Sequence, residues 1–305
     1  MKIEIGDTRI RYRIEIYGKY SVIAGDSGTG KTTLFELIQD YNDNPKLVKC
    51  KSDLPLVAID RRAKEEILKE YNNCLLVMDE DCRLLKQYNV ASLLKESKNY
   101  FLIISRKNMN WLPLSVDNYY KLEYENGINY NIPKYKRNLK EEFFRVAQIV
   151  TEDQESGRRF FEEYFSDISV SSAHSKSELV DYLVKQDFEG KTLVVYDAAA
   201  FAYEMERMQR YIEGKNIEIL DWECFEHFIL KSKPFDLVLT QKDCDWSVES
   251  LEQFAAKQLE QRIPYTKASL GKCLRKQSGC AKCEKVPTCS YKHETIDFNL
   301  RIEGE

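Results

Sequence analysis

The chain has 305 residues, of which 43% are hydrophobic and 31% are charged. This length suits two domains of about 100–200 residues each, and the apolar content is enough for two cores. The formal net charge of −4 excludes a chain that is basic throughout. Any contact with nucleic acid must therefore come from a local basic patch.

The apolar runs of the chain are short. Residues 101–104 form one of the longest, far below the ~20 residues that a membrane helix needs. The first five residues alternate like a strand, and no apolar leader core follows them. We therefore expect a cytoplasmic protein with no membrane partner. In that compartment the nine cysteines are expected to be thiols or metal ligands rather than disulfides.

Strands and helices are expected to alternate along the first half of the chain, which predicts an α/β fold with a parallel sheet. The expected strands are residues 2–5, 10–17, 20–24, 56–59, 74–78 and 100–104, and the expected helices are residues 31–41, 62–71 and 84–96. Asn126-Gly127 predicts a tight hairpin between strands at residues 119–124 and 128–132.

A second α/β alternation follows a polar, basic segment at residues 133–138, which we interpret as a linker. The expected strands are residues 146–151, 168–171, 192–196, 217–220 and 236–240, and the expected helices are residues 157–165, 177–186, 198–213 and 247–260. We predict three parts: a nucleotide-binding domain at residues 1–138, a second α/β domain at 139–261, and a basic, cysteine-rich tail at 262–305.

A glycine-rich segment between the strand at 20–24 and the helix at 31–41 matches G-x-x-x-x-G-K-S/T, the P-loop motif. Its glycines let backbone N–H groups point at phosphate oxygens, and the helix N-terminus favours negative charge. Lys31 would reach the β- and γ-phosphates, and Thr32 would bind Mg²⁺. The alternative is a chance glycine-rich turn. The predicted cofactor-binding residues here are Gly25, Asp26, Ser27, Gly28, Thr29, Gly30, Lys31, Thr32 and Thr33.

Two acids, Asp79 and Glu80, end the apolar strand at residues 74–78, as in a Walker B motif. Asp79 would bind Mg²⁺ and Glu80 would activate the attacking water. The alternative is a buried strand that ends in surface acids. The strand at 100–104 resembles the sensor strand of additional-strand P-loop ATPases, so Ser105 would sense the γ-phosphate and Arg106 would stabilise charge. The alternative is the ordinary polarity of residues that end a strand. No N-K-x-D motif is present, which favours ATP over GTP.

Residues 148–161 resemble the first motif of a Toprim domain, in which a strand ends in a glutamate and a helix follows. Residues 193–199 resemble the strand that carries the Toprim D-x-D motif, and residues 221–230 resemble the glutamate-aromatic-leucine segment of Toprim nucleases in phage defence. The resemblance makes Glu152 the catalytic general acid or base and Asp197 a catalytic, metal-binding acid.

Two positions depart from the Toprim pattern: Asp153 replaces a glycine, and Ala199 replaces the second aspartate. A lost carboxylate weakens the binding of hard cations, although Glu226, or Asp243 and Asp245, would be able to compensate. Three interpretations stay open at this point: an active Toprim-like domain, an inactive one, and an unrelated α/β domain.

Four cysteines with the spacing C-x₆-C-x₂-C-x₅-C lie in the polar tail: Cys273, Cys280, Cys283 and Cys289. Four thiolates suit a tetrahedral Zn²⁺ site, and an iron–sulfur cluster uses the same ligands. Free thiols are the alternative, because the outer spacings match no strict metal motif. Lysines and arginines surround these cysteines, and such a basic knuckle would contact phosphate backbones.

The combination is similar to the ATPase-plus-Toprim organisation of OLD-type and related anti-phage proteins. That resemblance implies an ATP-hydrolysing protein that requires Mg²⁺ and acts on DNA or RNA, in phage defence or on a mobile element. The rival is a nucleotide-switched sensor or scaffold whose inactive second domain binds a protein partner or a second copy of the chain.

Overall fold

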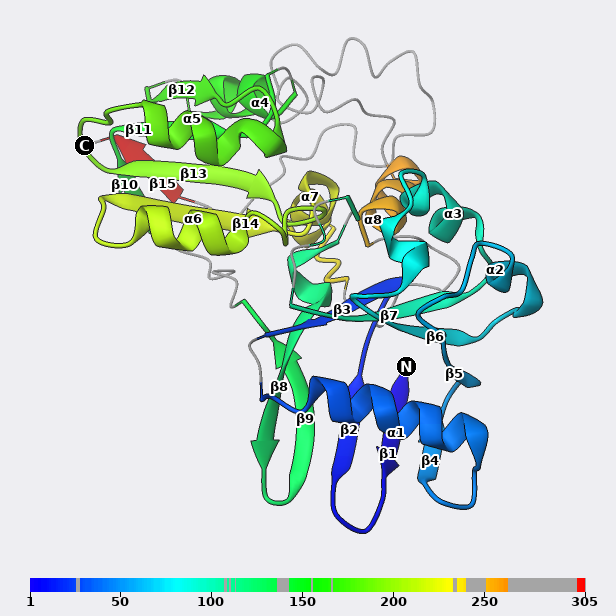
Figure 1. The fold of residues 1–305 in the computed structure, drawn as a ribbon. Coiled ribbons are helices and arrows are strands. Elements are labelled where there is room, and N and C mark those ends of the chain that lie inside the picture. Colours follow the sequence, from blue (N-terminus) through cyan, green and yellow to red (C-terminus); the bar gives the residue numbers. More distant parts are fainter. Residues whose placement is uncertain are drawn as a thin grey trace. The chain divides into compact units, whose positions relative to one another are not determined.

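The described residues form two compact units, the first ending at residue 135 and the second beginning at residue 143. The computed structural model describes residues 1–25, 28–106, 109, 111–112, 114–135, 143–154, 156–165, 167–232, 235–239, 251–262 and 301–304. Both units contain sheets and helices, so the predicted α/β class is confirmed (Figure 1).

The first unit is built on a nine-stranded sheet of described residues, in the order β4-β1-β2-β9-β8-β3-β7-β6-β5. Its strands are β1 (Lys2–Gly6), β2 (Arg11–Glu15), β3 (Tyr20–Ala24), β4 (Lys49–Ser52), β5 (Leu56–Ala58), β6 (Leu75–Asp79), β7 (Tyr100–Ser105), β8 (Tyr119–Glu125) and β9 (Ile128–Pro133). Its helices are α1 (Lys31–Asp43), α2 (Ile67–Glu70) and α3 (Val90–Glu96), with 3₁₀ turns η1 (Arg83–Lys86) and η2 (Val116–Asn118).

The parallel part of this sheet brings β3, β6 and β7 together. Strand β7 pairs with β3 on one side and with β6 on the other. The whole of β3 and β6 and all of β7 after Tyr100 are buried, as near-continuous apolar sequences require in a sheet covered on both faces. The parallel order aligns the carboxyl ends of the three strands at one edge of the sheet.

The other end of the sheet is antiparallel, with β1 between β2 and β4. Alternation places the side chains of Ile3, Ile5, Tyr12 and Ile14 in one core with Leu34 and Ile38 of α1. Helix α1 crosses these strands in Figure 1. The predicted hairpin is also present: Glu125 pairs with Ile128, and Asn126 and Gly127 have φ values of 50° and 84°, as a type I′ turn requires.

Two helix predictions for this unit were wrong, and one strand was not predicted. The helix expected at residues 62–71 is confined to α2, because Asp60 accepts the N–H of Arg62 and turns occupy residues 60–66. The helix expected at 84–96 is divided into η1 and α3. Strand β4 was missed, since its sequence Lys-Cys-Lys-Ser carries no apolar run.

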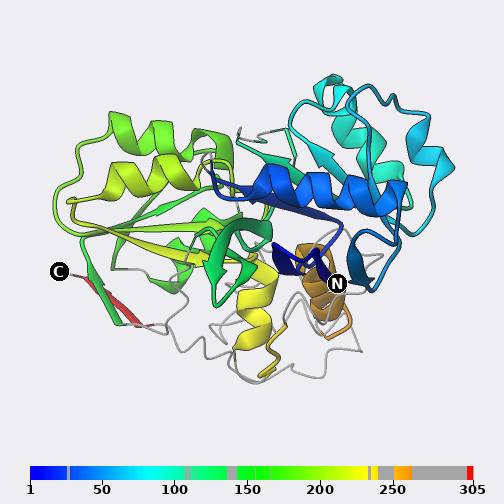
Figure 2. The same cartoon turned by 60° about the horizontal axis from the view of Figure 1, so that its bottom comes forward.

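The second unit contains a parallel sheet of described residues in the order β12-β11-β13-β14, and a separate parallel pair, β10 with β15. Helices α5 and α6 lie side by side along this sheet, and Figure 2 shows them together on one face. Its strands are β10 (Phe143–Val146), β11 (Gln148–Thr151), β12 (Ser169–Ser172), β13 (Thr192–Asp197), β14 (Ile217–Trp222) and β15 (Arg301–Gly304). Its helices are α4 (Ser156–Tyr164), α5 (Leu179–Lys185), α6 (Met205–Ile212), α7 (Phe225–Lys231) and α8 (Leu251–Glu260), with the 3₁₀ turn η3 (Lys176–Glu178).

Two predictions for this unit were also wrong. The helix expected at residues 198–213 begins only at Met205, because Ala198 and Ala199 donate their N–H groups to Trp222 and Glu223 and Ala200 has φ 60°. Residues 236–239 form no strand, and Asp236 has φ 47°. None of the helices in the described ranges combines the length and apolar character needed to span a bilayer.

Candidate functional site

The glycine-rich loop after β3 has the left-handed backbone that only glycine adopts without strain. Gly25, Gly28 and Gly30 have φ values of 139°, 82° and 85°. At Gly30 an added Cβ would also lie 3.0 Å from the hydroxyl of Tyr12, which donates to the Gly30 carbonyl at 2.8 Å. Asp26 and Ser27 lie outside the described residues.

Lys31 begins α1 and folds back over this loop. Its Nζ donates to the carbonyl of Gly25 at 2.7 Å and to Oγ1 of Thr29 at 2.9 Å. The side chain is buried, yet it lines a pocket together with the exposed Thr32. Thr33 instead hydrogen-bonds to Tyr12. The loop thus gathers a buried ammonium and a hydroxyl at one pocket.

The carboxyl ends of β6 and β7 form the opposite wall of the same pocket. Asp79, Glu80 and Ser105 all line it, because Asp79 pairs with Ile104, next to Ser105, across the two strands. The full lining is Lys31, Thr32, Phe35, Arg61, Asp79, Glu80, Asp81, Ile104, Ser105 and Arg106. The residues predicted from two separate motifs therefore meet in one pocket.

Two of the acids in this pocket, Asp79 and Glu80, are held by arginines. Arg61 donates to Oδ2 of Asp79 from Nε at 2.6 Å and from Nη2 at 2.5 Å. Arg106 donates to Glu80 from its backbone N–H at 2.6 Å and from Nε at 2.9 Å, while Ser105 Oγ lies 3.4 Å from Oε2 of Glu80. The Asp79 carboxylate raises the pKa of the Arg61 guanidinium.

Arg61 was not among the residues predicted from the sequence. A signal for it existed, since Arg61 follows the strand next to β6 and so reaches the same sheet edge. The pocket thus collects one lysine and two arginines, cations of the kind that bind phosphate, together with a carboxylate and a hydroxyl, which are hard oxygen ligands.

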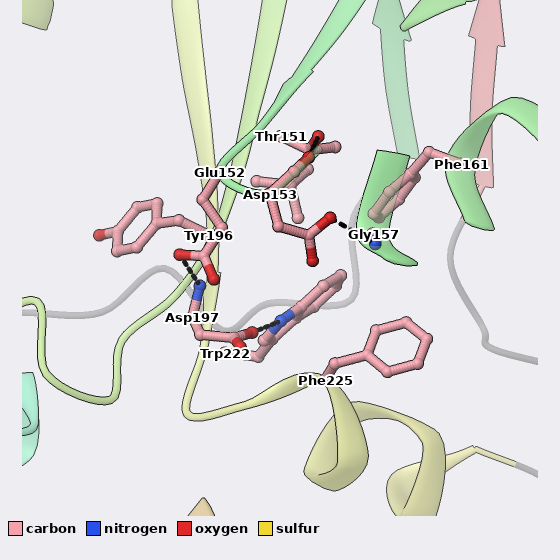
Figure 3. A pocket seen from close by; sticks show the side chains of 10 residues that line it. Thr151, Glu152, Asp153, Gly157, Phe161, Tyr196, Asp197, Trp222 and Phe225 are labelled. Atoms are coloured by element: carbon pink, nitrogen blue, oxygen red, sulfur yellow. Dashed lines mark hydrogen bonds between the residues drawn. The ribbon is translucent and has the colours of Figure 1, made fainter. Parts of the chain in front are cut away.

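In the second unit, Glu152 and Asp197 close adjacent parallel strands, β11 and β13. The backbone N–H of Asp197 donates to Oε2 of Glu152 at 3.2 Å, and Figure 3 shows the two carboxylates side by side. The predicted convergence of these acids is confirmed; their catalytic roles stay predictions. Trp222 donates Nε1 to Oδ1 of Asp197 at 2.7 Å, which fixes that carboxylate.

Burial raises the pKa of Glu152 to about 8, and the nearby charge of Asp197 adds to the rise. Lys176 opposes it, with Nζ 4.0 Å from Oε1 of Glu152. The same ammonium donates to the carbonyl of Ala199 at 2.8 Å. Lys176 therefore lies between Glu152 and Ala199.

Asp153 caps the first turn of α4. Its Oδ1 accepts the N–H of Gly157 at 2.7 Å, as an acid at a helix N-terminus commonly does. It lines the same small pocket as the acid pair, between the aromatic side chains of Phe161, Trp222 and Phe225 (Figure 3). The Asp153 carboxylate therefore binds the N-terminal turn of α4.

Within the described residues no group of three or more acidic, histidine or cysteine side chains is arranged to hold a metal ion. Glu226 is buried on α7 and does not line the pocket. Asp243 and Asp245 lie outside the described residues, so their predicted compensation stays a prediction.

The predicted tail ligands, Cys273, Cys280, Cys283 and Cys289, lie outside the described residues. Cys50, Cys74, Cys82 and Cys224 are free thiols in the structure. Burial raises the pKa of the Cys224 thiol well above its usual value, and its sulfur accepts the N–H of His227 at the start of α7.

Comparison of the chain with protein-family models, with curated proteins and with solved structures finds no match.

Proposed function

We propose that the chain binds ATP with Mg²⁺ and hydrolyses it, and that this reaction serves a Toprim-like second domain. One observation carries the first part: Lys31, Thr32, Asp79 and Glu80 line a single pocket at the carboxyl ends of β6 and β7. The position of β7 between β3 and β6 supports the resemblance to additional-strand P-loop ATPases.

In this proposal Lys31 moves its ammonium from Gly25 and Thr29 onto the β- and γ-phosphates. Bound Mg²⁺ would neutralise phosphate charge, with Thr32 and Asp79 holding it. Glu80 accepts a proton from the attacking water, and the Arg106 backbone N–H orients its carboxylate. Ser105 reports the γ-phosphate through its contact with Glu80.

Two substitutions separate nucleotide binding from turnover. Lys31→Ala removes phosphate charge compensation and abolishes binding of a fluorescent ATP analogue. Glu80→Gln retains binding and lowers hydrolysis on the order of 10²–10⁴-fold. Lys121→Ala and Glu125→Gln, at exposed positions of β8, are the matched controls. Hydrolysis at the wild-type rate by Glu80→Gln contradicts the role given to Glu80.

For the second unit, the convergence of Glu152 and Asp197 favours phosphodiester chemistry on DNA or RNA, in phage defence or on a mobile element. The placement of Lys176 against Glu152 and Ala199 favours the rival, an inactive Toprim-like domain that binds a partner protein or a second copy of the chain.

Nicking of supercoiled plasmid in Mg²⁺ or Mn²⁺ separates these two functions. An active domain nicks DNA and loses that activity in Glu152→Gln and Asp197→Asn, but not in the exposed-residue control Glu189→Gln. Absence of nicking by the wild type, or nicking that persists in both acid variants, contradicts phosphodiester chemistry at this pair.

A further inference from the structure

The outward face of β4-β1-β2 is crowded with cations. Alternation sends the apolar side chains of these strands toward α1, and the intervening residues are exposed to solvent. The exposed side chains are Lys2, Glu4, Arg11, Arg13, Lys49 and Lys51. Five of these six residues are basic, in a chain whose formal net charge is −4, so the charge of this face is local.

The strand register places these cations around a hollow. Gly6 of β1 pairs with Lys49 on one side and with Arg11 on the other, so these two cations come from the strands on either side of β1. Gly6 itself is closely packed, because an added Cβ would lie 2.5 Å from the carbonyl oxygen of Ile10. Lys46, from the loop before β4, also lines this hollow. The charged residues of the lining are Glu4, Asp7, Arg11, Arg13, Lys46, Lys49 and Lys51, five cations against two acids.

The two acids are already engaged by the protein. Asp7 accepts the N–H groups of Arg9 and Ile10 and the guanidinium of Arg9 in the β1–β2 turn. Glu4 lies 3.4 Å from the guanidinium of Arg13. Within the described part of the chain, no ion pair engages the side chains of the remaining four cations, which are Arg11, Lys46, Lys49 and Lys51.

The spacing of these cations suits a polyanion better than a single ion. Neighbouring strands lie about 4.8 Å apart, and residues two positions apart on one strand about 6.6 Å apart, so the charges are spread over the face. Uncompensated like charge weakens folding through repulsion, and a bound polyanion relieves it. Tyr130 of β9 pairs with Arg13 at the border of the face and offers a ring on which a base can stack.

We propose that the outward face of β4-β1-β2 binds the phosphate backbone of single-stranded nucleic acid. The hollow shares no residue with the lining of the nucleotide pocket. The surface is therefore a binding site of its own, and it stands whether or not the chain hydrolyses ATP. It gives an acidic protein a local means of holding nucleic acid.

The test is fluorescence anisotropy of a labelled oligothymidylate with the full chain, without nucleotide, between about 50 and 200 mM salt. The slope of log K against log salt is negative, and each lost phosphate contact makes it shallower by about 0.7 for a single strand. The triple variant Arg11→Gln/Lys49→Gln/Lys51→Gln is therefore expected to have a slope that is shallower by about 2. Its affinity for the oligonucleotide at about 0.1 M salt is expected to fall on the order of 100-fold.

The matched control is Lys64→Gln/Lys69→Gln/Lys98→Gln, which removes three exposed lysines elsewhere in the first unit. The charge-preserving double variant Lys49→Arg/Lys51→Arg retains wild-type binding, which separates lost charge from misfolding. As a second measurement, a bromodeoxyuridine oligonucleotide is expected to photo-crosslink to the peptide that contains Tyr130. A salt slope that is equal in the triple variant and the control, or binding to phosphatidylserine vesicles without binding to the oligonucleotide, overturns the proposal.

Discussion

Arg61 holds Asp79 through two nitrogens on one carboxylate oxygen, with Nε at 2.6 Å and Nη2 at 2.5 Å from Oδ2. The other oxygen of Asp79 accepts the N–H of Asp81 at 3.0 Å. A cation that binds to Asp79 must therefore compete with the guanidinium of Arg61.

Removing Arg61 is expected to ease metal binding. The Arg61 side chain is 57% exposed, and an ion pair at such a surface contributes about 0–1 kcal/mol. In Arg61→Ala the Mn²⁺ concentration needed for half-saturation, followed by electron paramagnetic resonance with ATP present, should fall up to about fivefold. Arg62→Ala is the control, since Arg62 is also exposed but does not line the pocket. A weaker Mn²⁺ affinity in Arg61→Ala would show that Arg61 supports the metal instead.

Tyr12→Phe is expected to loosen the glycine-rich loop. The Tyr12 phenol donates to the Gly30 carbonyl, and burial raises its pKa to about 12, so it keeps its proton over a wide pH range. Loss of one such hydrogen bond costs about 1 kcal/mol, or a few degrees in Tm, and should weaken binding of the ATP analogue. Tyr124→Phe, at a side chain 69% exposed, is the control and should change neither. Unchanged Tm and affinity in Tyr12→Phe would mean that this bond does not hold the loop.

The raised pKa of Glu152 predicts a pH-dependent stability. In the folded chain Glu152 stays protonated up to about pH 8, whereas in the unfolded chain it ionises near its usual value of 4.5. The native state binds more protons between these values, so the free energy of unfolding falls as the pH rises through this window. Below about pH 4.5 the stabilising contribution of Glu152 to the free energy of unfolding is fully present.

Glu152→Gln should remove this decrease of the free energy of unfolding with pH. Thermal melts between about pH 5 and 8.5 should show a decrease in Tm of several degrees for the wild type and a flatter profile for the variant. Glu189→Gln, at an exposed site of the same unit, should follow the wild type. Parallel profiles in Glu152→Gln and the wild type would show that Glu152 ionises normally in the fold.

The cysteine-rich tail is expected to carry a metal. Elemental analysis should give about one Zn per chain, or iron with a visible chromophore. Cys280→Ser/Cys283→Ser should lose it, and Cys50→Ser, a free thiol of the first unit, should not. Metal content unchanged in the double variant would place the metal elsewhere, and none in the wild type would favour free thiols.

Local signals in the sequence determined much of the first unit. Positive φ at Gly25, Gly28 and Gly30 belongs to the motif itself, and the Asn126-Gly127 turn needs no distant partner. Strands that end in acids could also be recognised, because apolar runs and the polar residues after them are neighbours in the chain. The convergence of Glu152 with Asp197 followed, since parallel strands bring their carboxyl ends to one edge.

Only the tertiary structure decided which side chains complete these sites. Strand order depends on pairings between distant segments, so the insertion of β7 between β3 and β6 has no local signal. Arg61 and Lys176 are long, flexible side chains from loops and turns, and their partners Asp79 and Glu152 lie on other segments of the chain. Asp153 departed from a motif in the sequence, and the fold gave it a structural role as the cap of α4. Contacts of this kind depend on the relative positions of whole elements, which residue spacing along the chain does not encode.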